Sequence, residues 1–194
     1  MSRTGKWEGH GRIAIIQLSN PPINSVNDKL LLDLAQTLDE IEESDDIRVL
    51  VIVSAISKVF ATGRQSGSEA DRFLGNQKLC NVLKKIANQS LPSISIISGK
   101  AVGPGLEIAL ACDLRISDRS SKFGFYSDVS PTSISKASLI ELIGPAKAKE
   151  MIWLGQLFNA QEAIAVGMVN RIFPESLLLN EGLEMANSII HQKK

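Results

Sequence analysis

Residues Leu91–Ser117 read LPSISIISGKAVGPGLEIALACDLRIS, and this stretch decides the fold. We expect an apolar strand over residues 93–98, a glycine-rich turn, a short helix from about Pro104 to Cys112 and a second strand over residues 113–117. Pro104 suits the first turn of a helix, because its φ is already helical and no N–H is needed there. A strand that ends at a helix N-terminus presents free N–H groups, which can bind an anion or a carbonyl that acquires negative charge.

Glu107 lies in the first turn of this expected helix and has two interpretations. In the structural one, the glycines only make a tight strand-to-helix turn and the carboxylate complements the helix dipole. In the functional one, a carboxylate among apolar neighbours and beside oxyanion donors acts as a general acid or base on a carbonyl compound. The functional interpretation expects Glu107 to be partly buried at the mouth of the corner.

The composition indicates a single domain over residues 1–194. A chain of this length is too short for two ordinary domains, and 44% of it is hydrophobic and 22% charged. The formal net charge is zero, with 21 basic and 21 acidic residues, so no overall field would attract nucleic acid or an anionic membrane. The first residues lack the apolar core of an export signal, and no run has the length of a membrane span. We therefore expect a cytoplasmic protein without nucleic-acid or membrane partners.

Cysteine and histidine are scarce in the chain. Cys80 and Cys112 are its two cysteines, and we expect both to be unpaired thiols. The two histidines, His10 and His191, complete no metal-ligand spacing. No metal site is expected.

Apolar periodicity predicts the remaining elements. The domain core is expected over about residues 10–174, followed by a terminal helix over about 175–191. Asn27 or Asp28 can cap a helix that runs to about residue 43, and Gly144 is expected to divide two helices. The other expected strands cover residues 11–19, 48–55 and 168–173, and the other expected helices cover residues 66–89, 131–143, 145–154 and a short segment from 159.

Four motifs together cover nearly the whole chain: residues 98–124 (SGKAVGPGLEIALACDLRISDRSSKFG), residues 20–27 (NPPINSVN), residues 49–64 (VLVIVSAISKVFATGR) and residues 144–174 (GPAKAKEMIWLGQLFNAQEAIAVGMVNRIFP). In order and spacing they resemble the crotonase superfamily, the enoyl-CoA hydratase/isomerase family. The resemblance implies an α/β fold of the ClpP/crotonase type, a spiral of ββα units, with the C-terminal helical region truncated in this chain. It also implies an acyl-CoA or acyl-carrier-protein thioester as partner, coenzyme A as part of the substrate with no separate cofactor, and a homo-oligomer, either a trimer or a hexamer.

The resemblance places an oxyanion hole and one carboxylate on particular residues. The first oxyanion N–H falls on Arg64, whose side chain could reach a CoA phosphate or point to solvent. The second falls on Pro104, which has no N–H, so Gly103 or Gly105 would have to replace it. The first catalytic carboxylate falls on Glu107.

The second catalytic carboxylate falls on Ser127, and a shift of one residue to Asp128 would restore an acid. A strict hydratase needs two carboxylates around one water, whereas a double-bond isomerase or a decarboxylase needs fewer groups. Residues Ser130–Lys136 also replace the glycine-rich turn usual in the family. The sequence therefore predicts a weak or altered hydratase, isomerase or decarboxylase that stabilises an enolate. The alternative is a non-catalytic module that binds an acyl thioester or a partner protein.

Overall fold

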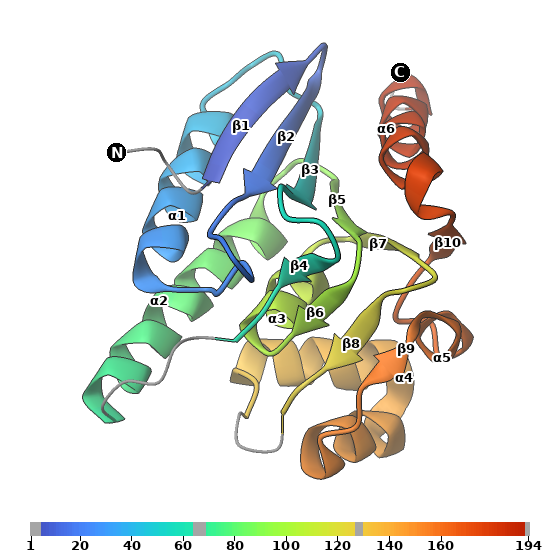
Figure 1. The fold of residues 1–194 in the computed structure, drawn as a ribbon. Coiled ribbons are helices and arrows are strands. Elements are labelled where there is room, and N and C mark those ends of the chain that lie inside the picture. Colours follow the sequence, from blue (N-terminus) through green and yellow to red (C-terminus); the bar gives the residue numbers. More distant parts are fainter. Residues whose placement is uncertain (1–4, 64–68, 127–129, 193–194) are drawn as a thin grey trace.

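The computed structural model describes residues 5–63, 69–126 and 130–192, which form two sheets with helices around them (Figure 1). Within these ranges no helix is both long enough and apolar enough to cross a membrane. The strands are β1 (Gly5–His10), β2 (Ile13–Leu18), β3 (Val49–Ser54), β4 (Val59–Ala61), β5 (Ser93–Ile97), β6 (Lys100–Val102), β7 (Leu114–Asp118), β8 (Lys122–Gly124), β9 (Phe158–Asn159) and β10 (Arg171–Phe173). The helices are α1 (Asp28–Glu42), α2 (Glu69–Asn88), α3 (Pro104–Ala111), α4 (Ser133–Leu154), α5 (Ala160–Ala165) and α6 (Glu175–Gln192).

The two sheets are connected by a repeated unit. The larger sheet has the order β1-β2-β3-β5-β7-β10, in which β1 runs antiparallel to β2 and the strands from β2 to β10 are parallel. The smaller sheet has the order β4-β6-β8-β9. Along the chain, β3, β5 and β7 of the larger sheet lead into β4, β6 and β8 of the smaller one, and each pair is followed by a helix, α2, α3 or α4. This is the spiral of ββα units that the sequence motifs imply.

The larger sheet is buried on both faces. One face belongs to an apolar cluster with residues of α1, α2 and α3, and α6 covers the other face over β3, β5 and β7 (Figure 1). The side under α6 contains Val49 and Val51 of β3, whereas Leu50 and Ile52 point to the opposite cluster. A continuous apolar run is typical of a parallel strand covered on both faces, so the prediction for residues 48–55 is confirmed.

Two helix boundaries follow the local signals in the sequence. Asn27 Oδ1 accepts a hydrogen bond from the Leu30 N–H at 2.8 Å and begins α1. Gly144 has φ 77° and ψ 158°, which interrupts α4 immediately before Pro145. The predicted division of this segment at Gly144 is therefore present as a kink.

The strand predicted over residues 168–173 is shorter in the structure, because β10 begins at Arg171. The N–H groups of Met168 and Val169 both donate to the carbonyl oxygen of Ala163, at 2.9 and 3.2 Å. These bonds close the end of α5, so the two residues are not available to a sheet ladder.

Serine–aspartate pairs join β5 to β7 at both ends. The N–H and hydroxyl of Ser93 each donate to Asp113 Oδ2 at 2.7 Å, and the Ser98 hydroxyl donates to Asp118 Oδ2 at 2.6 Å. In both pairs the partners are 20 residues apart in sequence. The second pair lies where β5 ends and the chain turns into β6, which leads to α3.

Gly182 sets the distance between α6 and the larger sheet. A Cβ atom placed on Gly182 would lie 2.3 Å from Ile96 Cδ1 and 3.1 Å from Ile116 Cδ1.

We expect Gly182→Val to lower the free energy of unfolding by about 1–3 kcal/mol, because overpacking forces neighbouring side chains out of their rotamers. Urea denaturation measures this loss. Glu184→Val, at an exposed position of the same helix, is the control, and equal losses in the two variants would contradict the packing argument.

Candidate active site

The corner predicted from the sequence lies at the start of α3. Gly103 precedes the helix with φ 57° and ψ −128°, a conformation that glycine adopts readily, and Pro104 occupies the first helical position as predicted. N–H groups in the first turn of a helix have no acceptor within the helix, so Gly105 and Leu106 present theirs at this end. The positive end of the helix dipole lies at the same place.

Gly103 and Gly105 differ in what their N–H groups can do. The Gly103 N–H donates to the carbonyl oxygen of Gly124 at 2.9 Å and extends the pairing of β6 with β8. It is therefore engaged within the sheet, which corrects the expectation that Gly103 could supply the donor missing at Pro104. Gly105 remains the candidate for the second oxyanion N–H.

The end of β4 lies directly against the start of α3. A Cβ atom on Gly105 would lie 2.0 Å from the carbonyl oxygen of Ala61, and one on Gly103 would lie 3.8 Å from Gly63 Cα. Position 105 therefore accepts only glycine, since a side chain would collide with the β4 backbone. The chain passes the start of α3 immediately before Arg64, the candidate first oxyanion donor, which itself lies outside the described residues.

Asn24 holds β4 in this position. Its Nδ2 atom lies 3.0 Å from the carbonyl oxygens of Leu18 and Phe60 and 2.7 Å from Ser54 Oγ. The backbone carbonyl oxygen of Asn24 accepts a hydrogen bond from the Thr62 N–H at 3.1 Å. Asn24 is fully buried and has φ 47°, a conformation that asparagine tolerates better than most residues. Asn24 belongs to the motif of residues 20–27, but the motif did not reveal this role. The available signal was an asparagine two residues after a pair of prolines.

Glu107 is the predicted catalytic residue whose surroundings are best defined. It is 2% exposed, more buried than expected, and its Oε2 atom accepts hydrogen bonds from the Thr132 N–H at 2.8 Å and the Thr132 hydroxyl at 2.5 Å. Burial raises the pKa of the carboxyl group above its ordinary value, and the hydrogen bonds from Thr132 and Ser135 lower it in part. A buried carboxyl group beside free N–H donors is suited to moving protons to and from a carbonyl compound.

Ser127 and Asp128, the candidates for the second carboxylate position, lie outside the described residues. The chain is described again from residue 130, and Thr132 then forms the N-cap of α4, where its hydroxyl oxygen accepts from the Ser135 N–H at 3.3 Å. Sequence reasoning did not identify Thr132 as a neighbour of Glu107. Threonine is a common N-cap residue at the start of a helix, and this was the available signal.

The two cysteines are free thiols, as predicted. Burial raises the pKa of the Cys112 thiol to about 12, so it stays protonated and unreactive near neutral pH. Among the residues that the structure describes, no three His, Cys, Asp or Glu side chains are grouped to hold a metal ion.

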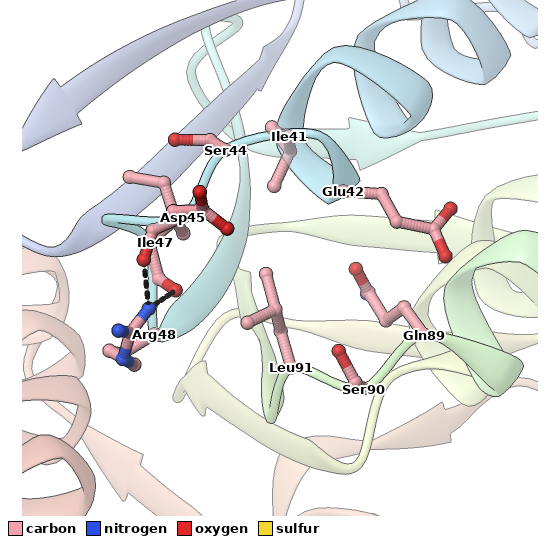
Figure 2. A pocket seen from close by; sticks show the side chains of 9 residues that line it. All are labelled: Ile41, Glu42, Ser44, Asp45, Ile47, Arg48, Gln89, Ser90 and Leu91. Atoms are coloured by element: carbon pink, nitrogen blue, oxygen red, sulfur yellow. Dashed lines mark hydrogen bonds between the residues drawn. The ribbon is translucent and has the colours of Figure 1, made fainter.

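A separate pocket of about 240 Å³ lies at the amino ends of β3 and β5 in the larger sheet (Figure 2). In it the Arg48 guanidinium donates to the carbonyl oxygens of Asp45 and Ile47, at 2.5 and 2.8 Å. Its lining consists of Ile41, Glu42, Ser44, Asp45, Ile47, Arg48, Gln89, Ser90 and Leu91. Because ligands of open α/β sheets bind beyond the carboxyl ends of the strands, we assign the candidate active site to the α3 corner.

The sequence is similar to known enoyl-CoA hydratases and to their family model. The model of the enoyl-CoA hydratase/isomerase family matches residues 8–194. The chain is 29% identical over 196 residues to the short-chain-enoyl-CoA hydratase of Clostridium acetobutylicum, a match that covers 94% of this chain and 74% of that protein. It is 32% identical over 163 residues to the mitochondrial methylglutaconyl-CoA hydratase of Rattus norvegicus, covering 79% of this chain and 51% of that protein.

Solved structures show the same architecture. DspI of Pseudomonas aeruginosa superposes with a TM-score of 0.94 at 26% identity, covering 99% of this chain and 82% of that one. An enoyl-CoA hydratase from Bacillus anthracis superposes with a TM-score of 0.92 at 28% identity, covering 96% of this chain and 76% of that one. The predicted crotonase-type α/β fold is confirmed. Since the family model matches nearly the whole chain, this protein belongs to the enoyl-CoA hydratase/isomerase family of the crotonase superfamily.

Proposed function

We propose that this protein binds an acyl-CoA thioester and stabilises the enolate that forms when a proton leaves the carbon next to the thioester carbonyl. One observation carries the proposal: Glu107 is a buried carboxyl group in the first turn of α3, beside the free N–H groups of that turn. Membership of the family, and the names of two relatives as hydratases of CoA thioesters, support this class of substrate. Coenzyme A is then part of the substrate, and an acyl-carrier protein is the alternative carrier.

The thioester oxygen would be held at the start of α3. We assign the two donors to the backbone N–H groups of Arg64 and Gly105, with the helix dipole adding to their effect. Pro104 removes one donor from this end of the helix, and in other enzymes the loss of one oxyanion donor costs about 10²–10³ in rate. We therefore propose weaker enolate stabilisation than two well-placed donors would give.

Glu107 would remove the proton from the substrate and return it to the same or another carbon. One carboxyl group is sufficient for proton exchange or for the shift of a double bond. Addition of water needs a second acid–base group, and the sequence places Ser127 there with Asp128 beside it. We therefore propose isomerase-type proton transfer in preference to efficient hydration, and decarboxylation as a further reaction that passes through the same enolate.

A non-catalytic role is the second candidate function, and Pro104 is the observation that favours it. A proline at the first helical position leaves the fold of the corner intact while removing a donor from it. Such a corner could bind a thioester, or the protein could bind another polypeptide, without accelerating a reaction.

Apolar side chains at the end of α4 support a homo-oligomer. Trp153 is 68% and Leu154 72% exposed, and the two are adjacent in sequence. Neighbouring exposed apolar side chains indicate an interaction surface, and most oligomers of identical chains are symmetric. We propose a trimer or hexamer.

Proton exchange at the substrate tests the proposed function directly. In D₂O the wild-type protein is expected to exchange the protons next to the thioester carbonyl of a 3-enoyl-CoA and to shift its double bond, both followed by NMR. Glu107→Gln should reduce exchange by about 10²–10⁴-fold, the usual contribution of a general acid or base.

Glu141→Gln is the matched control, because Glu141 is an exposed carboxylate on α4. It should exchange at the wild-type rate. Unchanged exchange in Glu107→Gln would remove Glu107 from the reaction. A wild-type protein that is stabilised by CoA but exchanges no proton would indicate the binding function instead.

The pH dependence of stability tests the burial of Glu107 independently of substrate. Its pKa in the folded protein lies above the ordinary 4.5, so the folded state binds the proton more tightly than the unfolded state. This contribution is fully present below pH 4.5 and is lost as the pH rises through the folded pKa. Glu107→Gln should therefore gain stability relative to wild type as the pH rises above 4.5, measured by denaturation at several pH values. Parallel pH profiles of the two proteins would show that Glu107 is not buried as a titrating group.

A further inference from the structure

The contact between Thr132 and Glu107 joins the first turn of α3 to the cap of α4. Thr132 contributes two donors to a single oxygen of Glu107, its N–H at 2.8 Å and its hydroxyl at 2.5 Å from Oε2. Each oxygen of a carboxylate has two lone-pair sites for hydrogen bonds. Thr132 alone therefore fills both sites of Oε2.

The Thr132 hydroxyl lies between Glu107 and the rest of the cap. Thr132 Oγ1 accepts a hydrogen bond from the Ser135 N–H at 3.3 Å. Its single proton has two acceptors in reach, Glu107 Oε2 at 2.5 Å and Ser135 Oγ at 3.1 Å, and the shorter contact to a carboxylate is the stronger one. Ser135 is buried, which protects this arrangement from water.

We propose that Thr132 is a positioning residue for Glu107, which holds Oε2 with two hydrogen bonds and leaves Oε1 as the oxygen that exchanges a proton with the substrate. The inference rests on the proposed function and adds which atom of the carboxyl group acts. Thr132 and Ser135 lie in the segment Ser130–Lys136, where the family resemblance expects a glycine-rich turn. A glycine at either position would carry no hydroxyl group.

Apart from burial, the hydrogen bonds from Thr132 and Ser135 are the described influences on the ionisation of Glu107. The charged side chains that the structure describes on the elements packed against α3 are directed to solvent or paired elsewhere, as Lys85 is with Asp39. The exposed ones are Lys78 and Lys84 on α2, Lys136, Glu141, Lys147 and Lys149 on α4, and Lys58 and Lys100 beside β4 and β6. Removal of the Thr132 hydroxyl should therefore favour the protonated carboxyl group.

Three substitutions at one turn test the proposal in the full-length protein. Thr132→Val keeps the shape and the N–H but removes the hydroxyl, Thr132→Ser keeps both donors, and Ser133→Ala changes an exposed neighbour as the control. The rate of proton exchange in D₂O is measured against pH with the same 3-enoyl-CoA. Thr132→Val should lower the maximum rate by about 10- to 100-fold, since small displacements of a reacting group have effects of this size. Its acid limb should also move to higher pH, and Thr132→Ser and Ser133→Ala should follow wild type.

A second measurement does not require turnover. The carboxyl ¹³C resonance of Glu107, assigned by its absence in Glu107→Gln, is titrated in each protein. Its midpoint should rise in Thr132→Val and return in Thr132→Ser. If Thr132→Val does not fold, Thr132→Gly serves in its place, because glycine is tolerated at a helix N-cap, keeps the N–H and carries no hydroxyl group.

The outcomes separate this inference from the proposed function. An unmoved midpoint in Thr132→Val, or a rate lowered equally at every pH, would overturn the positioning role and leave the proposed function standing. A wild-type protein without exchange would overturn the proposed function and the assignment of Oε1 with it. A raised midpoint together with a displaced acid limb supports both.

Discussion

The close approach of β4 to the corner that begins α3 is the constraint on which the rest of the site depends. A Cβ atom on Gly99 would lie 1.8 Å from the carbonyl oxygen of Lys58, and one on Gly105 would lie 2.0 Å from that of Ala61. The backbone of the corner therefore packs directly against the backbone at both ends of β4, with no room for a side chain between them. Asn24 holds the strand from the other side. With β4 in this position, Gly63 at the end of the described segment lies beside Gly103, immediately before the first turn of α3.

Much of the fold could be predicted from the sequence because its elements have local signals. The cap of α1, the proline that begins α3 and the glycine that bends α4 are each determined by neighbouring residues. The smaller sheet could not be predicted in this way, since β4, β6, β8 and β9 have two or three residues each and show no periodicity. The edge strand β1 was also not anticipated. Its position depends on pairing with β2, not on a pattern of its own.

The residues of the candidate site also differ in whether local sequence signals could reveal them. Local signals could place Gly105 and Glu107 in the first turn of α3, whereas their roles in the site come from the family resemblance and stay predictions. Thr132 reaches Glu107 across 25 residues, and Asn24 reaches Phe60 across 36, so neither contact has a local signature. Pro104 shows that even a local signal can be incomplete. The sequence reveals a missing N–H, but only the structure shows that the Gly103 N–H is already used by Gly124.

The serine–aspartate pairs between β5 and β7 have a consequence for how the corner is located. A strand with one apolar face cannot slip by one residue without turning that face to water, whereas β5 is buried on both faces, so exposure to water does not by itself set its alignment. Packing and polar groups have to specify it. The Ser93–Asp113 and Ser98–Asp118 hydrogen bonds fix the two ends of β5 against β7, and in each pair the partners are 20 residues apart. A displaced strand would break both of these hydrogen bonds. Accurate placement of Glu107 thus begins with hydroxyl groups at the two ends of a strand that carries no predicted catalytic residue.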